Sequence, residues 1–114
     1  MKTRSETFLL KDEILWEFAG EGMKRQIMGY DEQIMLVKVK FNEGAIGYEH
    51  THYHSQTTYV VSGVFEFVVD GVKQIVKEGD GIYIAPNILH GAKCLEAGIL
   101  IDVFSPMRED FLKK

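Results

Sequence analysis

Residues 44–63, GAIGYEHTHYHSQTTYVVSG, contain three of the four histidines of this 114-residue chain. Side chains two residues apart on an extended strand share one face and lie about 6.6 Å apart. His50 and His52 have this spacing, so their imidazoles can converge on one metal ion at about 2.0–2.1 Å. His90, in the apolar segment ILHGA, can supply a third imidazole. The alternative is a set of surface histidines with a structural, buried His90, and we expect His54 to be an exposed bystander.

Apolar and polar residues alternate around this stretch, which predicts β-strands. Residues 33–41, QIMLVKVKF, are the clearest case. Four apolar side chains share one of their faces: Met35, Val37, Val39 and Phe41. Residues 64–69 and 72–76 flank Asp70-Gly71, a strong signal for a β-hairpin.

Further β-rich segments occur at residues 81–85 and 99–104, and we expect turns at residues 62–63 and 97–98 to separate short strands. This pattern predicts an all-β antiparallel sandwich or barrel. The chain length predicts one domain over residues 1–114. After the last strand, Ser105 has the character of a helix N-cap and Pro106 that of a first helical residue. We therefore expect a helical turn over residues 107–112.

Composition and charge exclude several classes of function. Thirteen basic and seventeen acidic residues give a net charge of −4, and no basic patch is present, so we expect no nucleic-acid partner. The apolar runs are far shorter than the roughly 20 residues that span a bilayer. The amino-terminal segment has charges within its apolar stretch and no cleavage signature, so we expect a cytoplasmic protein without a membrane partner. The single Cys94 can form no internal disulfide, and we expect it to pack in the core.

The histidine spacing resembles a family motif. Residues 44–63 match the first cupin motif, G-x5-H-x-H-x3-E-x6-G, except that Gln56 replaces Glu. Gly79 and His90 fit the second motif, G-x5-P-x-G-x2-H-x3-N, whereas three positions depart from it: Ala85, Asn87 and Cys94. Asn tolerates left-handed backbone angles, so Asn87 can replace Gly. The resemblance implies the RmlC-like double-stranded β-helix, a jelly-roll barrel, with its motif core over about residues 30–104.

The same resemblance implies one divalent metal held by His50, His52, Gln56 and His90. Three imidazoles and an amide leave the two charges of the metal uncompensated by protein. Such a site favours an anionic substrate or a bound hydroxide. The ligand types suit Zn, Ni, Fe or Mn without choosing among them.

A carboxylate interrupts the last apolar strand. In ILIDVF, Asp102 shares a face with Leu100 and Phe104. A buried carboxylate is costly without a partner. Either Arg108 forms a structural ion pair with Asp102, or the acid is retained for chemistry.

A second resemblance covers residues 102–112, DVFSPMREDFL, and residues 24–56, KRQIMGYDEQIMLVKVKFNEGAIGYEHTHYHSQ. Both segments are similar to small cupins of the pectin-degradation (KdgF-type) family. The resemblance implies conversion of 4,5-unsaturated monouronates to the linear 4-deoxy-5-keto uronate. The functional trio of that family falls on Asp102, Phe104 and Arg108. Met107 and Tyr53 depart from prolines that are common in the family.

In the mechanism that we expect, Asp102 is a general acid/base, Arg108 holds the carboxylate of a small anionic sugar acid, and Phe104 packs against the sugar ring. Two alternatives remain on the same scaffold: a metal-dependent oxygenase, and a non-catalytic cupin that binds sugar acids. The resemblance and the exposed sheet edges of so small a barrel also favour a homodimer.

Overall fold

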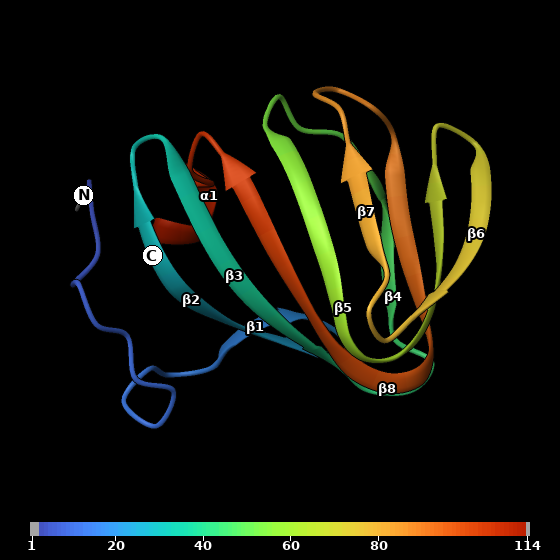
Figure 1. Cartoon of the computed structure of the whole chain (residues 1–114), viewed down its shortest axis with the longest axis horizontal. Coiled ribbons are helices and arrows are strands. Elements are labelled where there is room, and N and C mark those ends of the chain that lie inside the picture. The colour runs from blue at the N-terminus through green and yellow to red at the C-terminus, as the bar shows by residue number, and fades with distance from the viewer. Residues whose placement is uncertain (1–2, 114) are drawn as a thin grey trace.

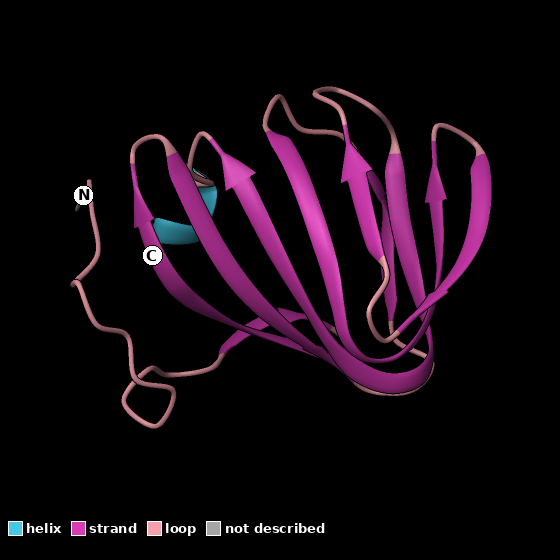
Figure 2. Ribbon diagram, viewed as in Figure 1, coloured by secondary structure: helices cyan, strands magenta, loops and turns pink. Residues whose placement is uncertain are grey.

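Eight strands make up most of the chain in a computed structural model, which describes residues 3–113 (Figures 1 and 2). Every pairing between these strands is antiparallel. The strands are β1 (Glu17–Gly20), β2 (Met23–Asp31), β3 (Ile34–Phe41), β4 (Ile46–His50), β5 (Ser55–Val69), β6 (Val72–Lys77), β7 (Gly81–Ile84) and β8 (His90–Ser105). The all-β antiparallel architecture predicted from the alternation is therefore confirmed.

The two longest strands, β5 and β8, connect the two walls of the barrel. In one wall, the end of β8 pairs with β3 and the beginning of β5 pairs with β7. In the other wall, the beginning of β8 pairs with β4 and the end of β5 pairs with β6. Figure 1 shows both strands curving at the bottom of the barrel. The walls thus share their central strands, and the space between them contains the core and the site.

Residues 62–63 and 97–98 lie where β5 and β8 bend. We predicted turns there that would end the strands, and this was wrong, because both strands continue through these residues with register shifts. Glycine makes the close crossing possible: a Cβ on Gly63, whose φ is +86°, would lie 2.6 Å from the carbonyl oxygen of Glu96. A Cβ on Gly98 would overlap the carbonyl of Ser62. The glycines that resemble turn signals instead permit two strands to cross.

The core lies between the walls and follows the predicted alternation. The four inward residues of β3, Met35, Val37, Val39 and Phe41, are all buried. Phe41 packs edge-to-face against Phe65 of β5, with ring centres 5.1 Å apart. Cys94 is also buried here, as predicted.

Two backbone conformations agree with the sequence. Asp70 and Gly71 both have positive φ, 51° and 80°, which two-residue hairpin turns require, and they join β5 to β6. Asn87 has φ of 65°, as expected of a residue that replaces glycine.

The carboxyl-terminal helix is shorter than predicted. Helix α1 (Glu109–Leu112) begins three residues after Pro106, so Ser105 is not its N-cap. The Ser105 hydroxyl instead donates a hydrogen bond to the carbonyl oxygen of Gln33 (2.7 Å) and fastens the end of β8 to the β2–β3 turn. Arg108 occupies the N-cap position of α1 without a capping hydrogen bond.

An arm over residues 3–16, with a turn at residues 11–14, precedes the barrel and lies along its side (Figure 1). Gln26 of β2 is buried and holds this arm by donating from Nε2 to the carbonyl oxygens of Lys11 (3.0 Å) and Ile14 (2.7 Å). Within the described residues, no helix has the length and apolarity needed to span a membrane.

Candidate metal centre and cavity

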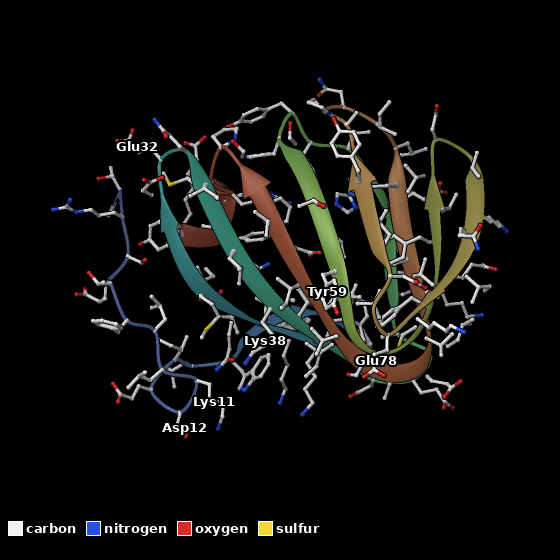
Figure 3. The ribbon with its side chains drawn as sticks, viewed as in Figure 1. Lys11, Asp12, Glu32, Lys38, Tyr59 and Glu78 are labelled. Carbon is white, nitrogen blue, oxygen red and sulfur yellow. The ribbon has the colours of Figure 1, made fainter. Side chains whose placement is uncertain are left out.

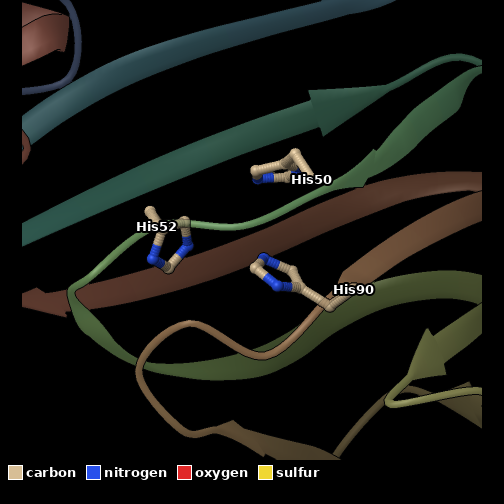
Figure 4. Close-up of side chains that lie close together, drawn as sticks. All are labelled: His50, His52 and His90. Atoms are coloured by element: carbon tan, nitrogen blue, oxygen red, sulfur yellow. The ribbon is translucent and has the colours of Figure 1, made fainter.

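Three histidine side chains lie close together, with His90 buried, His52 half-buried and His50 exposed (Figure 4). His50 ends β4 and pairs with His90, the first residue of β8, while His52 lies in the loop after β4. Their ligand atoms lie within 4.8 Å of one another. The structure thus brings together the three imidazoles that the sequence singled out. The expectation that His52 continues an extended strand was wrong, because the strand ends at His50.

Hydrogen bonds orient all three rings. The Nδ1 atom of each faces a backbone carbonyl oxygen: His50 that of Tyr48 (2.8 Å), His52 that of His54 (3.2 Å) and His90 that of Ile88 (2.8 Å). Nδ1–H donation leaves the Nε2 lone pair available for a metal. Burial lowers the pKa of His52 to about 4 and also lowers that of His90. Both rings are therefore neutral at neutral pH, as metal ligation requires.

Gln56 faces the same cluster from the start of β5. Its Oε1 atom lies 2.9 Å from Nε2 of His52. If Nδ1 of His52 carries the proton, these are two lone-pair donors facing each other, an arrangement that a shared cation stabilises. Metal–nitrogen bonds of about 2.0–2.1 Å place adjacent ligand atoms roughly 3 Å apart. The three imidazoles suit one divalent metal, and Gln56 lies beside His52, where the prediction places the fourth ligand.

A hydrogen-bond chain joins this cluster to Asp102. Gln56 donates from Nε2 to the Thr58 hydroxyl (3.0 Å), which donates to Oδ1 of Asp102 (2.7 Å). A glutamate at position 56 would lack the N–H that starts this chain. The sequence analysis missed Thr58, although Thr58 and Asp102 are direct partners across β5 and β8.

Asp102 and Arg108, both among the described residues, do not form the structural ion pair that was one of the two alternatives for this acid. Arg108 instead makes a two-point interaction with Asp110, from Nε to Oδ1 (3.0 Å) and from Nη2 to Oδ2 (2.9 Å). Asp110 lies two residues from Arg108 in the chain, so its carboxylate is within reach of the guanidinium group. Asp102 is left inside the barrel, where burial raises the pKa of its carboxyl group from 3.8 to about 6.

A cavity of about 240 Å³ connects these groups. Asp102, Phe104 and Arg108 line it together with His50 and His90. The guanidinium carbon of Arg108 lies 5.0 Å from the ring centre of Phe104 and 4.2 Å from that of Phe111 in α1. The three residues of the predicted functional trio therefore share one cavity with the histidine cluster.

His54 is not an exposed bystander, because only 4% of its surface is accessible. Its ring stacks on that of Tyr53 at 4.0 Å, and its Nε2 lies 3.1 Å from the carbonyl oxygen of Met107. Tyr53 donates its hydroxyl to Glu109 (2.8 Å). These contacts fasten the loop that carries His52 to the segment that carries Arg108. His54 thus has a structural contact outside the metal-ligand set.

An antiparallel barrel with three convergent histidines on its inner face defines a cupin-type metal site, and the comparisons with known proteins agree. The cupin domain family matches residues 37–104. The pectin degradation protein KdgF of Dickeya dadantii is 46% identical over 107 residues, which cover 92% of this chain and 97% of that protein.

Two solved structures are similar throughout. An RmlC-like cupin from Shewanella frigidimarina has a TM-score of 0.94 and 46% identity, covering 96% of this chain and 99% of that one. KdgF from a Halomonas species has a TM-score of 0.89 and 37% identity, covering 94% and 99%. This chain belongs to the cupin family and, within it, to the KdgF-type cupins.

Proposed function

We propose that this protein acts in the breakdown of pectin or alginate, where it converts 4,5-unsaturated monouronates to the linear 4-deoxy-5-keto uronate. The observation that carries the proposal is one cavity lined by His50 and His90 of the histidine cluster, the half-buried acid Asp102 and the cation Arg108. The 46% identity to KdgF of Dickeya dadantii supports the pathway. The neutral ligand set supports an anionic substrate.

The reaction is an isomerisation in which one proton changes place. The hemiacetal hydroxyl at C1 loses a proton as the bond between C1 and the ring oxygen breaks, which gives an aldehyde at C1 and an enolate at C5. A proton added at C4 then turns the enolate into a ketone. Atoms and electrons balance without an oxidant, a reductant or added water.

The residues of the cavity have distinct roles in this reaction. A divalent metal, when bound by His50, His52, Gln56 and His90, supplies a Lewis acid that polarises a substrate oxygen. Asp102 delivers the proton to C4 as a general acid, and Thr58 holds its carboxyl group in place. Arg108 attracts the substrate carboxylate. Phe104, buried beside the histidines, packs against the sugar ring and excludes water.

The test follows the ultraviolet absorbance of a 4,5-unsaturated monouronate with protein loaded with Zn, Ni, Fe or Mn. We expect faster loss than in an enzyme-free control, which matters because this substrate also rearranges unaided. Asp102→Ala should lose the acceleration while keeping its metal. Glu96→Ala, which removes an exposed acid from the same strand, should remain active. No acceleration by any metal-loaded form would contradict the proposal, and oxygen uptake with Fe would then indicate an oxygenase.

We also propose that the protein is a homodimer formed through the outer face of the wall that contains β3. Ile101 of β8 lies between Lys38 and Tyr59 in the strand register, on the face that Figure 3 shows. Tyr59 and Tyr83 are at least half exposed there. Light scattering should give twice the chain mass, and a Tyr59→Lys, Tyr83→Lys double variant should give the single mass. A wild-type protein that is monomeric at micromolar concentration would refute this interface.

A further inference from the structure

A second guanidinium group lines the cavity, and no sequence motif pointed to it. Arg25 of β2 lines the same cavity as Asp102 and Arg108. Its guanidinium carbon lies 3.9 Å from the centre of the Phe111 ring, and that of Arg108 lies 4.2 Å from the same centre. One aromatic ring of α1 therefore positions two cations at the wall of the cavity.

The two arginines differ in how much of their hydrogen-bonding capacity is used. Arg25 donates from Nε to Oε1 of Glu17 (3.2 Å), and within residues 3–113 this is the one hydrogen bond of its side chain. Arg108 already uses Nε and Nη2 for Asp110. A guanidinium carries five N–H donors in a planar fork that matches a carboxylate. Arg25 therefore has both Nη groups available, whereas one fork of Arg108 is occupied.

Glu17 orients Arg25 from outside the cavity. The side chains of the pair are mostly buried, with 20% of Arg25 and 26% of Glu17 accessible. Glu17 belongs to β1, and Glu17 and Arg25 are direct register partners between β1 and β2. The carboxylate and the stacked Phe111 ring together fix the guanidinium on two sides. Such an arginine loses little conformational freedom when it binds an anion, which favours tight binding.

We propose that Arg25 is the specificity-determining residue that binds the carboxylate of the substrate, sharing it with Arg108. The identity of that substrate as a uronate rests on the proposed function. Arg25 selects sugar acids over neutral sugars and positions the ring against Asp102, and it transfers no proton. Loss of a charged, two-point interaction weakens binding by about tenfold to a hundredfold.

The kinetic test compares Arg25→Gln, Arg25→Lys and the control Lys24→Gln in metal-loaded protein. Lys24 precedes Arg25 on β2 and is exposed, so its variant removes the same charge outside the cavity. We expect Arg25→Gln to raise KM for the unsaturated monouronate at least tenfold while kcat changes less than about threefold. Arg25→Lys should raise KM less, and Lys24→Gln should match wild type. An unchanged KM, or a loss confined to kcat, in a variant with full metal content would overturn the proposal.

A binding test separates this inference from the proposed reaction. Calorimetry measures the affinity of the protein for D-galacturonate, a saturated monouronate, and compares it with the affinity for D-galactose, its uncharged counterpart. We expect wild type to prefer the acid and Arg25→Gln to lose that preference. If wild type shows the preference and Arg25→Gln loses it, but wild type does not consume the unsaturated substrate, the reaction is refuted and the role of Arg25 is supported. If Arg25→Gln fails to fold, Arg25→Lys decides, and a galacturonate affinity equal to that of wild type would refute the role.

Discussion

Replacing Asp102 by Asn should make the metal-free protein more stable while removing its activity. The Asp102 carboxyl group lines the cavity beside Leu100 and Phe104, the apolar residues two positions away on its own strand. The Thr58 hydroxyl donates a hydrogen bond to it, and Arg108 and Gln56 also favour its ionised form, but burial outweighs these three partners. Asn keeps an oxygen that accepts from Thr58 and removes the charge that burial opposes. The difference in unfolding free energy between variant and wild type therefore measures the cost of the charge on Asp102.

The magnitude follows from the pKa of Asp102, which burial raises from 3.8 to about 6. At about 1.36 kcal/mol for each tenfold change in acidity, the ionised group destabilises the folded state by about 3 kcal/mol at neutral pH. The folded state holds the proton more tightly than the unfolded state, so this cost is absent below pH about 4. It grows between pH 4 and 6 and is complete above pH 6.

The assay is urea unfolding of Asp102→Asn and wild type from pH 4 to 8, with the metal removed by a chelator. We expect equal stabilities near pH 4 and an advantage of about 1–3 kcal/mol for the variant at pH 7–8. For a chain of this length, each kcal/mol also raises Tm by about 4 °C. Glu96→Gln, an exposed substitution on the same strand, should change stability by less than about 0.5 kcal/mol. A variant no more stable than wild type at pH 8, or an advantage that shrinks as the pH rises, would refute this account.

Three further perturbations test other parts of the structure. Gly63→Ala should lower the free energy of unfolding by about 3 kcal/mol or more, because the added Cβ meets a neighbouring backbone. Gly71→Ala, also at positive φ but in open space, should lower it by about 1 kcal/mol. Equal losses of stability in urea titrations would contradict the close crossing. His90→Ala should lower the bound metal measured by mass spectrometry at least tenfold while the circular dichroism spectrum stays that of a barrel. Thr58→Val should lower kcat while KM and metal content stay unchanged, and Thr58→Ser should restore kcat. A Thr58→Ser variant as slow as Thr58→Val would show that the packing of this side chain matters and its hydroxyl does not.

The histidine cluster could be predicted from sequence because its geometry is mostly local. His50 and His52 are two residues apart, so any extended or nearly extended backbone keeps them close, and His90 needed only the strand pairing of β4 with β8. Thr58 could not be found in this way. It follows Gln56 in an ordinary alternating strand, and its importance arises from lying opposite Asp102 across two strands that are far apart in the chain.

The wrong predictions have a common physical cause. Gly63 and Gly98 were interpreted as turn residues because glycine is common in turns, but here it permits two backbones to approach each other. His54 was expected to be exposed because a lone polar residue in a loop usually is. The chain folds that loop under the carboxyl-terminal segment, and the carbonyl of Met107 then buries the ring. Each error concerns a contact made by a distant segment, which local patterns do not encode.

Charge is distributed unevenly between the chain and its cavity, and this distribution favours an acidic ligand. The chain as a whole carries a net charge of −4. The cavity contains two guanidinium groups, Arg25 and Arg108, against one half-buried acid, Asp102, whose carboxyl group resists ionisation. The acids that balance the arginines, Glu17 and Asp110, approach them from other sides. A divalent metal on neutral ligands would add two more positive charges. The interior field therefore attracts an anion into a protein whose overall charge would repel it, and the selection is made by the cavity.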